Sequence, residues 1–273
     1  MNEVKSIGVV GGGMVGRATA RCFMEWGLVK VYDSDPDRST HKAEDVLACD
    51  LVFLCLPTPQ EPMGYRADTS AIESFLSPLA GSEANLVLKS TVPVGTTRRL
   101  REEYRLPNLV HSPEFLTARC SLVDAQTPAR NIVGGEYGDC SKTLTNLLSK
   151  RFPGVPVIQM TSDESELVKL VVNGFFSVKV AYFNEVRTLA DQLGMSWDRV
   201  MRGVLSDGRI AHSHTQVPGP DGQRGFGGAC LPKDLGNLIT MILDAKQTPW
   251  VTNAAMMRNR TTDRPGTLGE GQQ

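Results

Sequence analysis

The sequence predicts an α/β protein, in which a doubly wound and mostly parallel sheet is followed by an all-helical domain. Short apolar runs alternate with helical patterns over residues 1–160, and no strand pattern follows residue 160. The apolar runs are continuous, which is typical of strands that helices cover on both faces. A long helical pattern with a capping signal begins at Thr161, so we place the border between the two domains there.

The first domain, residues 1–160, is predicted to alternate strands with helices or turns. The expected strands span residues 6–10, 28–32, 51–55, 86–89, 109–111, 131–133 and 155–159. The expected helices span residues 15–26, 70–79, 95–103 and 140–151. This alternation favours parallel pairing, because each crossover segment returns the chain to the starting edge of the sheet.

The second domain, residues 161–257, is predicted to be all-helical, because no strand pattern follows residue 160. The expected helices span residues 161–193, 196–205 and 231–245. Thr161 and Glu164 fit a capping box at the start of the first, and Gly194 is suited to end it. Residues 258–273 have little apolar content, so we expect a mobile tail there.

The composition excludes several classes of protein. The chain has 273 residues, a formal net charge of −1 and 41% hydrophobic residues, which is an ordinary globular balance without a strongly basic surface. We therefore expect no nucleic-acid partner. No apolar run is long enough to span a bilayer and no signal-peptide pattern is present, so we expect no membrane partner and a cytoplasmic protein.

The cysteines and histidines indicate no metal site. None of the six cysteines has C-x-x-C spacing, so we expect reduced thiols, five of which pack as small hydrophobic residues. His212 and His214 are close enough in sequence to share a metal ion. Their surroundings offer no obvious third ligand, so a solvated loop is the better interpretation.

A glycine-rich motif lies between the first predicted strand and the first predicted helix. Its residues are Gly11, Gly12, Gly13, Met14, Val15 and Gly16. In this context G-x-G-x-x-G binds a dinucleotide, because the glycines let the backbone approach a pyrophosphate at a helix N-terminus. Asp33 ends the next strand, where a carboxylate binds ribose hydroxyls and repels a 2′-phosphate. We expect NAD; Arg38 leaves NADP as an alternative, and a purely structural turn is another.

Three further motifs follow predicted strands at their carboxyl ends, where ligands bind in open α/β sheets. They are Pro57-Thr58-Pro59, Lys89-Ser90-Thr91-Val92-Pro93-Val94-Gly95 and Ser112-Pro113-Glu114-Phe115-Leu116. Pro57 and Thr58 either contact the cofactor or stiffen a loop. Thr91 either presents its hydroxyl to the nicotinamide or a water, or caps the next helix. Glu114 is suited to act as an acid or base, with a surface carboxylate as the alternative.

Two polar residues interrupt an apolar stretch of the long helix. Lys169 and Asn173 are four residues apart, so both lie on one face. Together they are suited to donate hydrogen bonds to an oxygen that becomes negative during a reaction. The alternative is a solvated stripe, which explains two polar residues in so apolar a segment less well.

The most specific motif precedes the last predicted helix. It reads Gly225-Phe226-Gly227-Gly228-Ala229-Cys230-Leu231-Pro232-Lys233-Asp234. A helix N-terminus and Lys233 both favour a thiolate at Cys230, and Pro232 is tolerated in a first helical turn. Asp234 lies on the same face as Cys230, where it is suited to take a proton or orient water. The alternative is a buried structural cysteine.

In this order, the six blocks resemble the UDP-glucose and GDP-mannose dehydrogenase family. The resemblance spans residues 6–245, and residues 226–234 are its most specific part. It implies a Rossmann-type domain that binds NAD, followed by a helical domain that serves dimerisation and substrate binding.

The resemblance implies a four-electron oxidation of a primary alcohol to a carboxylate in two hydride transfers. The substrate would be a nucleotide sugar or another small polyol. Cys230 would attack the intermediate aldehyde to form a thiohemiacetal, which becomes a thioester that water hydrolyses. The residues implied to organise this water are Asp234, Glu114 and Thr91. Lys169 and Asn173 would stabilise the developing oxyanion.

The resemblance also implies how the substrate is held. The residues that would line the sugar site are Phe115, Leu116, Phe226 and Gly227. Arg209 resembles a family arginine that reaches a substrate in the neighbouring subunit. A homodimer built on the long helix is therefore implied.

The chain departs from the family pattern at several places, which bear on the substrate more than on the chemistry. Family members usually carry a third, C-terminal domain, and this chain ends where that domain is expected to begin. Residues 33–51 are short, as if one helix and one strand were missing. Ala118 stands where the family often has a second glutamate, and the loop 211–224 is long.

Two other functions remain open. A single-step hydroxyacid dehydrogenase also carries a helical Lys-x-x-x-Asn after its dinucleotide-binding domain, but it needs no thiol nucleophile. A catalytically inactive NAD-binding relative is the second alternative, which Ala118 and the missing third domain keep open.

Overall fold

The computed structural model describes residues 4–61, 65–135 and 138–265, and within these ranges the chain forms two compact units. The sheet unit comprises Met1–Pro59 and Ala67–Lys169, and the helical unit comprises Gln60–Arg66 and Leu170–Gln273. The division falls inside a long helix rather than before it. The short segment after the third strand belongs to the helical unit, which no sequence pattern indicates.

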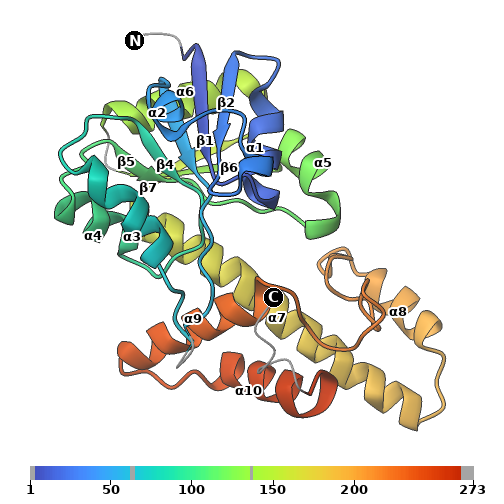
Figure 1. The fold of residues 1–273 in the computed structure, drawn as a ribbon. Coiled ribbons are helices and arrows are strands. Elements are labelled where there is room, and N and C mark those ends of the chain that lie inside the picture. Colours follow the sequence, from blue (N-terminus) through green and yellow to red (C-terminus); the bar gives the residue numbers. More distant parts are fainter. Residues whose placement is uncertain (1–3, 62–64, 136–137, 266–273) are drawn as a thin grey trace. The chain divides into compact units, whose positions relative to one another are not determined.

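The sheet unit contains one sheet in which all neighbouring strands are parallel except one pair (Figure 1). Its strands are β1 (Ser6–Val10), β2 (Leu28–Tyr32), β3 (Leu51–Leu54), β4 (Leu86–Leu88), β5 (Leu109–His111), β6 (Asn131–Gly134) and β7 (Val157–Met160). The strand order is β2-β1-β3-β4-β5-β6-β7, and β6 runs antiparallel to β5. The predicted doubly wound sheet is confirmed, and its order reverses direction between β1 and β3, where such sheets bind ligands.

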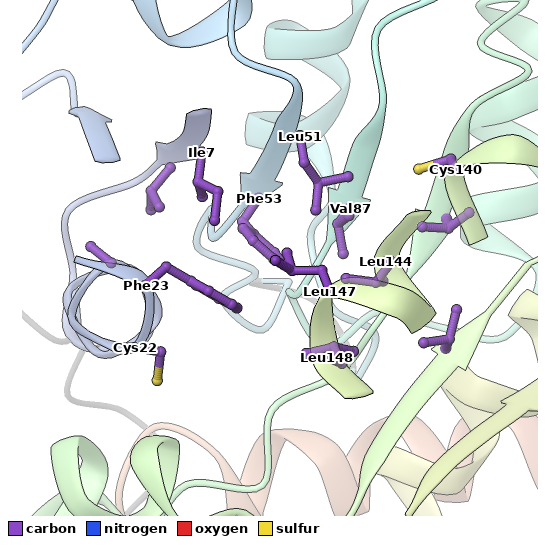
Figure 2. Close-up of a cluster of buried hydrophobic side chains, with 14 of the residues drawn as sticks. Ile7, Cys22, Phe23, Leu51, Phe53, Val87, Cys140, Leu144, Leu147 and Leu148 are labelled. Atoms are coloured by element: carbon purple, nitrogen blue, oxygen red, sulfur yellow. The ribbon is translucent and has the colours of Figure 1, made fainter. Parts of the chain in front are cut away.

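Both faces of this sheet are buried, which explains the continuous apolar strands. Alternate strand residues such as Ile7, Leu51, Phe53 and Val87 point to one face, where they pack with side chains of α1 and α6 (Figure 2). The residues between them pack on the opposite face with α2, α3 and α4. Because a strand alternates its side chains, both faces need apolar residues when helices cover both.

The helices of the sheet unit match the predicted ones in place but not always in length. They are α1 (Met14–Phe23), α2 (Ala43–Leu47), α3 (Ser70–Leu76), α4 (Thr96–Glu103), α5 (Ser121–Gln126) and α6 (Asp139–Arg151). The first ends at Phe23 rather than Trp26. The short α2 and α5 were not predicted, because segments this short show no helical periodicity. Between β2 and β3 the described chain has α2 but no additional strand.

The helical unit is built around α7, which starts in the sheet unit. Its helices are α7 (Ser162–Gln192), α8 (Trp197–Leu205), α9 (Leu231–Asp244) and α10 (Trp250–Arg258). The capping box is present, since the amide N–H of Thr161 donates to Glu164 Oε2 at 2.8 Å and that of Glu164 to Thr161 Oγ1 at 3.3 Å. Gly194 follows α7 with φ +64°, as expected of a residue that ends a helix.

The C-terminal segment corrects one prediction. Helix α10 was not predicted, and the mobile tail expected from residue 258 is wrong for the residues that the structure describes. Asn259–Asp263 form a π-helical turn in which Asn259 is only 1% exposed. The remainder of the expected tail, residues 266–273, lies outside the described residues.

Several predicted absences concern the described residues alone. In the part of the chain that the structure describes, no helix has both the length and the apolar character needed to cross a membrane. The same residues contain no cluster of three or more His, Cys, Asp or Glu side chains able to hold a metal ion. All six cysteines are described and none forms a disulfide, but Cys120 is exposed, so the expectation that it packs as a hydrophobic residue is wrong.

Candidate active site

In the glycine turn after β1, three glycines leave no room for a Cβ atom and one faces open space. A Cβ atom on Gly12 would lie 2.8 Å from the carbonyl oxygen of Arg38. A Cβ atom on Gly11, whose φ is +93°, would lie 2.4 Å from the carbonyl oxygen of Cys55. A Cβ atom on Gly16 would lie 1.7 Å from the carbonyl oxygen of Gly11. Gly13, in contrast, has nothing within 4 Å of its Cβ position. It is the N-cap of α1, so there is room for a pyrophosphate beside the helix N-terminus.

Asp33 lies beside this turn at the end of β2. Its carboxylate accepts hydrogen bonds from the backbone N–H groups of Gly12 at 2.5 Å and Asp35 at 2.9 Å. Partial burial opposes ionisation, but these hydrogen bonds outweigh it and lower the pKa of Asp33. Arg38 pairs with Asp35, with its Nε 3.1 Å from Asp35 Oδ2. A fixed anion beside the turn favours an unphosphorylated ribose, which fits NAD better than NADP.

The loops after β3 and β4 are bonded to each other. The Thr58 hydroxyl donates to the carbonyl oxygen of Thr91 at 2.9 Å, and the Ser90 hydroxyl donates to that of Leu56 at 2.6 Å. Thr58 therefore has a structural role whether or not it contacts a cofactor. Thr91 is half-buried, at the carboxyl end of β4 where the sequence placed it.

Glu114 and Lys169 form a buried ion pair within the sheet unit. Lys169 Nζ lies 2.9 Å from Glu114 Oε1, and the two side chains are 4% and 10% exposed. The other carboxylate oxygen of Glu114 accepts from the backbone N–H of Leu116 at 2.5 Å. Burial excludes both alternative interpretations, the surface carboxylate for Glu114 and the solvated stripe for Lys169. Charges that are both buried and paired are typical of functional sites.

Glu114, Phe115 and Leu116 also line a cavity of about 280 Å³ inside the sheet unit. Its apolar wall includes Phe23 and Phe53. The segment that the sequence assigned to substrate binding therefore borders space that a small molecule can enter.

A second buried cluster lies in the helical unit, around Asp234. Its carboxylate accepts from Asn173 Nδ2 at 2.6 Å and from Lys233 Nζ at 2.6 Å, and Asp234 is 1% exposed. Asn173 is itself buried, so it does not belong to a solvated stripe. The side-chain amide of Asn173 binds the carboxylate of Asp234 rather than facing solvent. The sequence did not predict this pairing.

Cys230 is the N-cap of α9, directly before this cluster. It is exposed, which excludes the alternative of a buried structural cysteine. Pro232 occupies the first turn, and the backbone N–H of Asp234 donates to the carbonyl oxygen of Cys230 at 2.8 Å. An exposed thiol at a helix N-terminus is the environment in which cysteines become nucleophilic.

The remaining predicted substrate residues differ in exposure. Phe115 and Leu116 are half-buried in the sheet unit. In the helical unit the side chain of Arg209 is 90% exposed and pairs with Asp207 at 2.6 Å. Phe226 is only 2% exposed, and its ring packs in the core of the helical unit rather than facing solvent.

Sequence reasoning assigned no role to three titratable residues of the sheet unit, of which Lys89 is half-buried and His111 and Glu166 are buried. Lys89 donates from Nζ to the carbonyl oxygen of Ser112 at 2.9 Å, and burial lowers its pKa. His111 lies with Nδ1 2.8 Å from the Ser165 hydroxyl, and burial lowers its pKa to about 3, so it is neutral. Glu166 is fully buried on α7. The available signal was the same as for Lys169, a charged residue in an apolar segment.

Glu166 anchors the N-terminus of α4. Its carboxylate accepts from the backbone N–H groups of Gly95 at 2.6 Å and Thr97 at 2.7 Å, and from the Thr97 hydroxyl at 2.6 Å. Burial raises the pKa of Glu166 to about 7 despite these hydrogen bonds. The loop that carries Thr91 is therefore held by a side chain from α7.

Comparison with known proteins accounts for both units. Residues 30–151 match the NAD binding domain of the UDP-glucose/GDP-mannose dehydrogenase family, and residues 163–261 match its central domain. The chain belongs to this family. The predictions of the family, of the Rossmann-type fold and of NAD as the cofactor of the first domain are thereby confirmed.

Similar proteins include enzymes of this family and one enzyme of another kind. UDP-glucose 6-dehydrogenase of Campylobacter jejuni is 32% identical over 194 residues, which cover 70% of this chain and 48% of that protein. A UDP-glucose dehydrogenase structure from Pyrobaculum islandicum has a TM-score of 0.80 at 26% identity and covers 94% of this chain and 68% of its own. The chain thus spans about half the length of the curated relatives it matches.

A fold likeness extends beyond the family. The structure of 3-hydroxyisobutyrate dehydrogenase from Mycobacterium tuberculosis has a TM-score of 0.72 at 18% identity, with 93% of this chain and 92% of that chain covered. At this identity the likeness shows the fold alone.

Proposed function

We propose that this protein is an NAD-dependent nucleotide-sugar 6-dehydrogenase that oxidises a primary alcohol to a carboxylate through a Cys230 thioester. The observation that carries the proposal is the exposed Cys230 at the N-terminus of α9, directly before the buried Asp234 cluster. A dehydrogenase that stops after one hydride transfer has no use for such a thiol.

The residues around the glycine turn fit the cofactor. Gly13 and the first turn of α1, Met14 and Val15, would receive the pyrophosphate, and Asp33 would bind the ribose hydroxyls. Pro57, Thr58 and Thr91 lie on the neighbouring strand-end loops. When bound, NAD supplies the acceptor for the hydride removed in each oxidation.

The side chains supply the rest of the chemistry. Loss of a hydride to NAD and of the hydroxyl proton turns the alcohol into an aldehyde, and the Cys230 thiolate then adds to the carbonyl carbon of this aldehyde to form a thiohemiacetal. Removal of its hydride gives a thioester, and water then cleaves the carbon–sulfur bond and restores the thiol. In the helical unit, Asp234 would position this water and take its proton, and Asn173 would stabilise the oxyanion. The family resemblance assigns the same two tasks to residues of the sheet unit, the water to Glu114 and Thr91 and the oxyanion to Lys169.

The stoichiometry of NADH formation tests this proposal. Purified protein would be mixed with NAD and UDP-glucose, then with other nucleotide sugars and with simple hydroxyacids. Two NADH for each nucleotide sugar consumed support the four-electron oxidation. One NADH, or turnover of a hydroxyacid only, would place the protein in the single-step class. NAD binding without turnover of any of them would fit the inactive relative that Ala118 suggests.

We also propose that α7 forms a homodimer interface. Four large apolar side chains at helical spacing on α7 are exposed, at 48% for Val171, 60% for Phe175, 61% for Tyr182 and 54% for Leu189. Sedimentation of Phe175→Glu beside wild type tests this, with Glu102→Gln as control because Glu102 is exposed on α4. A wild-type monomer, or a Phe175→Glu dimer of unchanged affinity, would overturn it.

A further inference from the structure

The loop that leads into Cys230 is fixed at Phe226 by a single asparagine. Asn259 Oδ1 accepts from the backbone N–H of Phe226 at 2.7 Å, and Asn259 Nδ2 donates to the carbonyl oxygen of Phe226 at 2.9 Å. Both residues are buried, at 1% and 2% exposure. One side-chain amide thus satisfies both backbone groups of Phe226, as a neighbouring strand would.

Arg264, which directly follows the π-helical turn that Asn259 begins, binds the same loop. Its Nε donates to the carbonyl oxygen of Arg224 at 3.0 Å, and its Nη2 donates to Asp221 Oδ2 at 2.6 Å. The backbone N–H of Arg264 in turn donates to the carbonyl oxygen of Asn259 at 2.7 Å. Asn259 and Arg264 therefore act as one unit on residues 221–226.

Two of the three glycines of the motif, Gly225 and Gly227, lie against these contacts. A Cβ atom on Gly225, whose φ is +70°, would lie 2.3 Å from Asn259 Oδ1. A Cβ atom on Gly227 would lie 1.8 Å from Arg264 Nη1. Both positions lack side chains because Asn259 and Arg264 approach the backbone closely there.

Cys230 lies between this contact and a second fixed point. Exposure rises from the buried Phe226 to the exposed Gly228, Ala229 and Cys230. On the other side, Asp234 is fixed by Asn173 and Lys233. The intervening residues include two glycines, which do not restrict the backbone. Phe226 therefore fixes where the loop that carries the thiol begins, and Asp234 fixes the helical turn that follows the thiol.

We propose that Asn259 and Arg264 form a clamp that positions the Cys230 loop, which makes the segment after α10 a positioning element of the thiol site. The proposal rests on the proposed role of Cys230 as nucleophile. Neither side chain touches the reacting atoms, so both are positioning residues. The clamp also gives a function to a segment whose composition predicted a mobile tail.

The test measures the reactivity of Cys230 without any substrate. In the full chain, Cys230 alkylation by iodoacetamide is followed against pH by mass spectrometry of its peptide, with the exposed Cys120 as internal reference. The variants are Asn259→Ala and Asn259→Asp, which keeps an acceptor for Phe226 N–H but loses the donor. Asn253→Ala is the matched control, because Asn253 is exposed on α10. Amide exchange of the peptide containing residues 225–230 is measured in parallel.

The clamp predicts that Asn259→Ala shifts the pH profile of Cys230 alkylation and speeds exchange at residues 225–230 by at least about fivefold. Asn259→Asp should lie between Asn259→Ala and wild type, and Asn253→Ala should match wild type. If Asn259→Ala does not fold, Arg264→Lys decides, since it keeps the charge near Asp221 but loses the guanidinium fork.

A Cys230 profile that superimposes on wild type in the folded variants would overturn the clamp, even if thermal stability falls. Failure of the proposed function is separate from failure of the clamp. If wild type forms no NADH while the Cys230 profile still shifts in Asn259→Ala, the clamp stands and the nucleotide-sugar dehydrogenase assignment does not.

Discussion

The two units fix their functional groups by different means. In the sheet unit, charged groups are held by backbone N–H groups, as Asp33 at the end of β2 and Glu166 on α7 are, or by a buried partner, as Glu114 is. In the helical unit the thiol lies between two residues that side-chain amides hold: Asn259 bonds Phe226 in the loop before the thiol, and Asn173 bonds Asp234 in α9 after it. Substitutions in the sheet unit should therefore change stability or cofactor binding in addition to any effect on the reaction, whereas those in the helical unit should change reactivity with the fold intact.

The largest effect is expected for Cys230→Ser. We expect formation of the carboxylate to fall by at least about 10³-fold, because a serine hydroxyl at this position lacks the nucleophilicity of a thiolate. The melting temperature and the dissociation constant for NAD should not change. Acid product and NADH are measured together, with Cys120→Ser as control because Cys120 is the other exposed cysteine. Acid formation at the wild-type rate by Cys230→Ser would eliminate the thioester route.

Unlike Cys230→Ser, the substitution Lys169→Met should lower the unfolding free energy of the protein. It leaves the Glu114 carboxylate buried without its partner, which costs about 3–5 kcal/mol of unfolding free energy. The double variant Lys169→Met with Glu114→Gln should recover much of this stability but no activity. Urea denaturation provides the measurement, and the exposed Lys142→Met is the control. If Lys169→Met is as stable as wild type, the pairing of Glu114 with Lys169 does not contribute to the stability of the sheet unit.

Asp33→Ala should weaken cofactor binding with a smaller effect on the fold. The loss of a charged acceptor for ribose hydroxyls should raise the dissociation constant for NAD by about 10- to 100-fold. Discrimination against NADP should fall as well, because the repelling anion is gone. Calorimetric titration of both nucleotides provides the measurement, and Asp37→Ala, in the same loop but exposed, is the control. Equal NAD affinities of Asp33→Ala and wild type would remove the cofactor role of this residue.

Features that leave a local pattern in the sequence could be predicted, whereas contacts between residues distant in sequence could not. The strands, the functional loops that follow them and the glycine turn could be predicted. Continuous apolar runs mark the strands, and a run of glycines marks the turn. The pairing of Glu114 with Lys169 could not, because the two residues are distant in sequence and each had a plausible separate role. Asn259 was missed because the polar segment Asn259–Asp263 has the composition of a tail although it buries this asparagine. Helix α10 was missed because its nine residues show little helical periodicity.

The smallest effect is expected at Glu166, where a backbone-held carboxylate of the sheet unit can be titrated. Burial raises the pKa of Glu166 from 4.5 to about 7, so the native state binds this proton more tightly than the unfolded chain. The resulting stabilisation is fully present below about pH 4.5 and is lost as the pH rises through about 7. Relative to Glu166→Gln, the unfolding free energy of wild type should fall by roughly 1–3 kcal/mol over that interval.

Urea denaturation across this pH range measures the difference in unfolding free energy between wild type and Glu166→Gln. The titrations of all other groups cancel in this difference. Glu185→Gln is the control, because Glu185 lies on the same helix and its side chain is 70% exposed. Parallel stability curves for wild type and Glu166→Gln would show that the carboxylate titrates normally. The hydrogen bonds from Gly95 and Thr97 would then outweigh burial, and backbone contacts alone would suffice to hold a buried charge in the sheet unit.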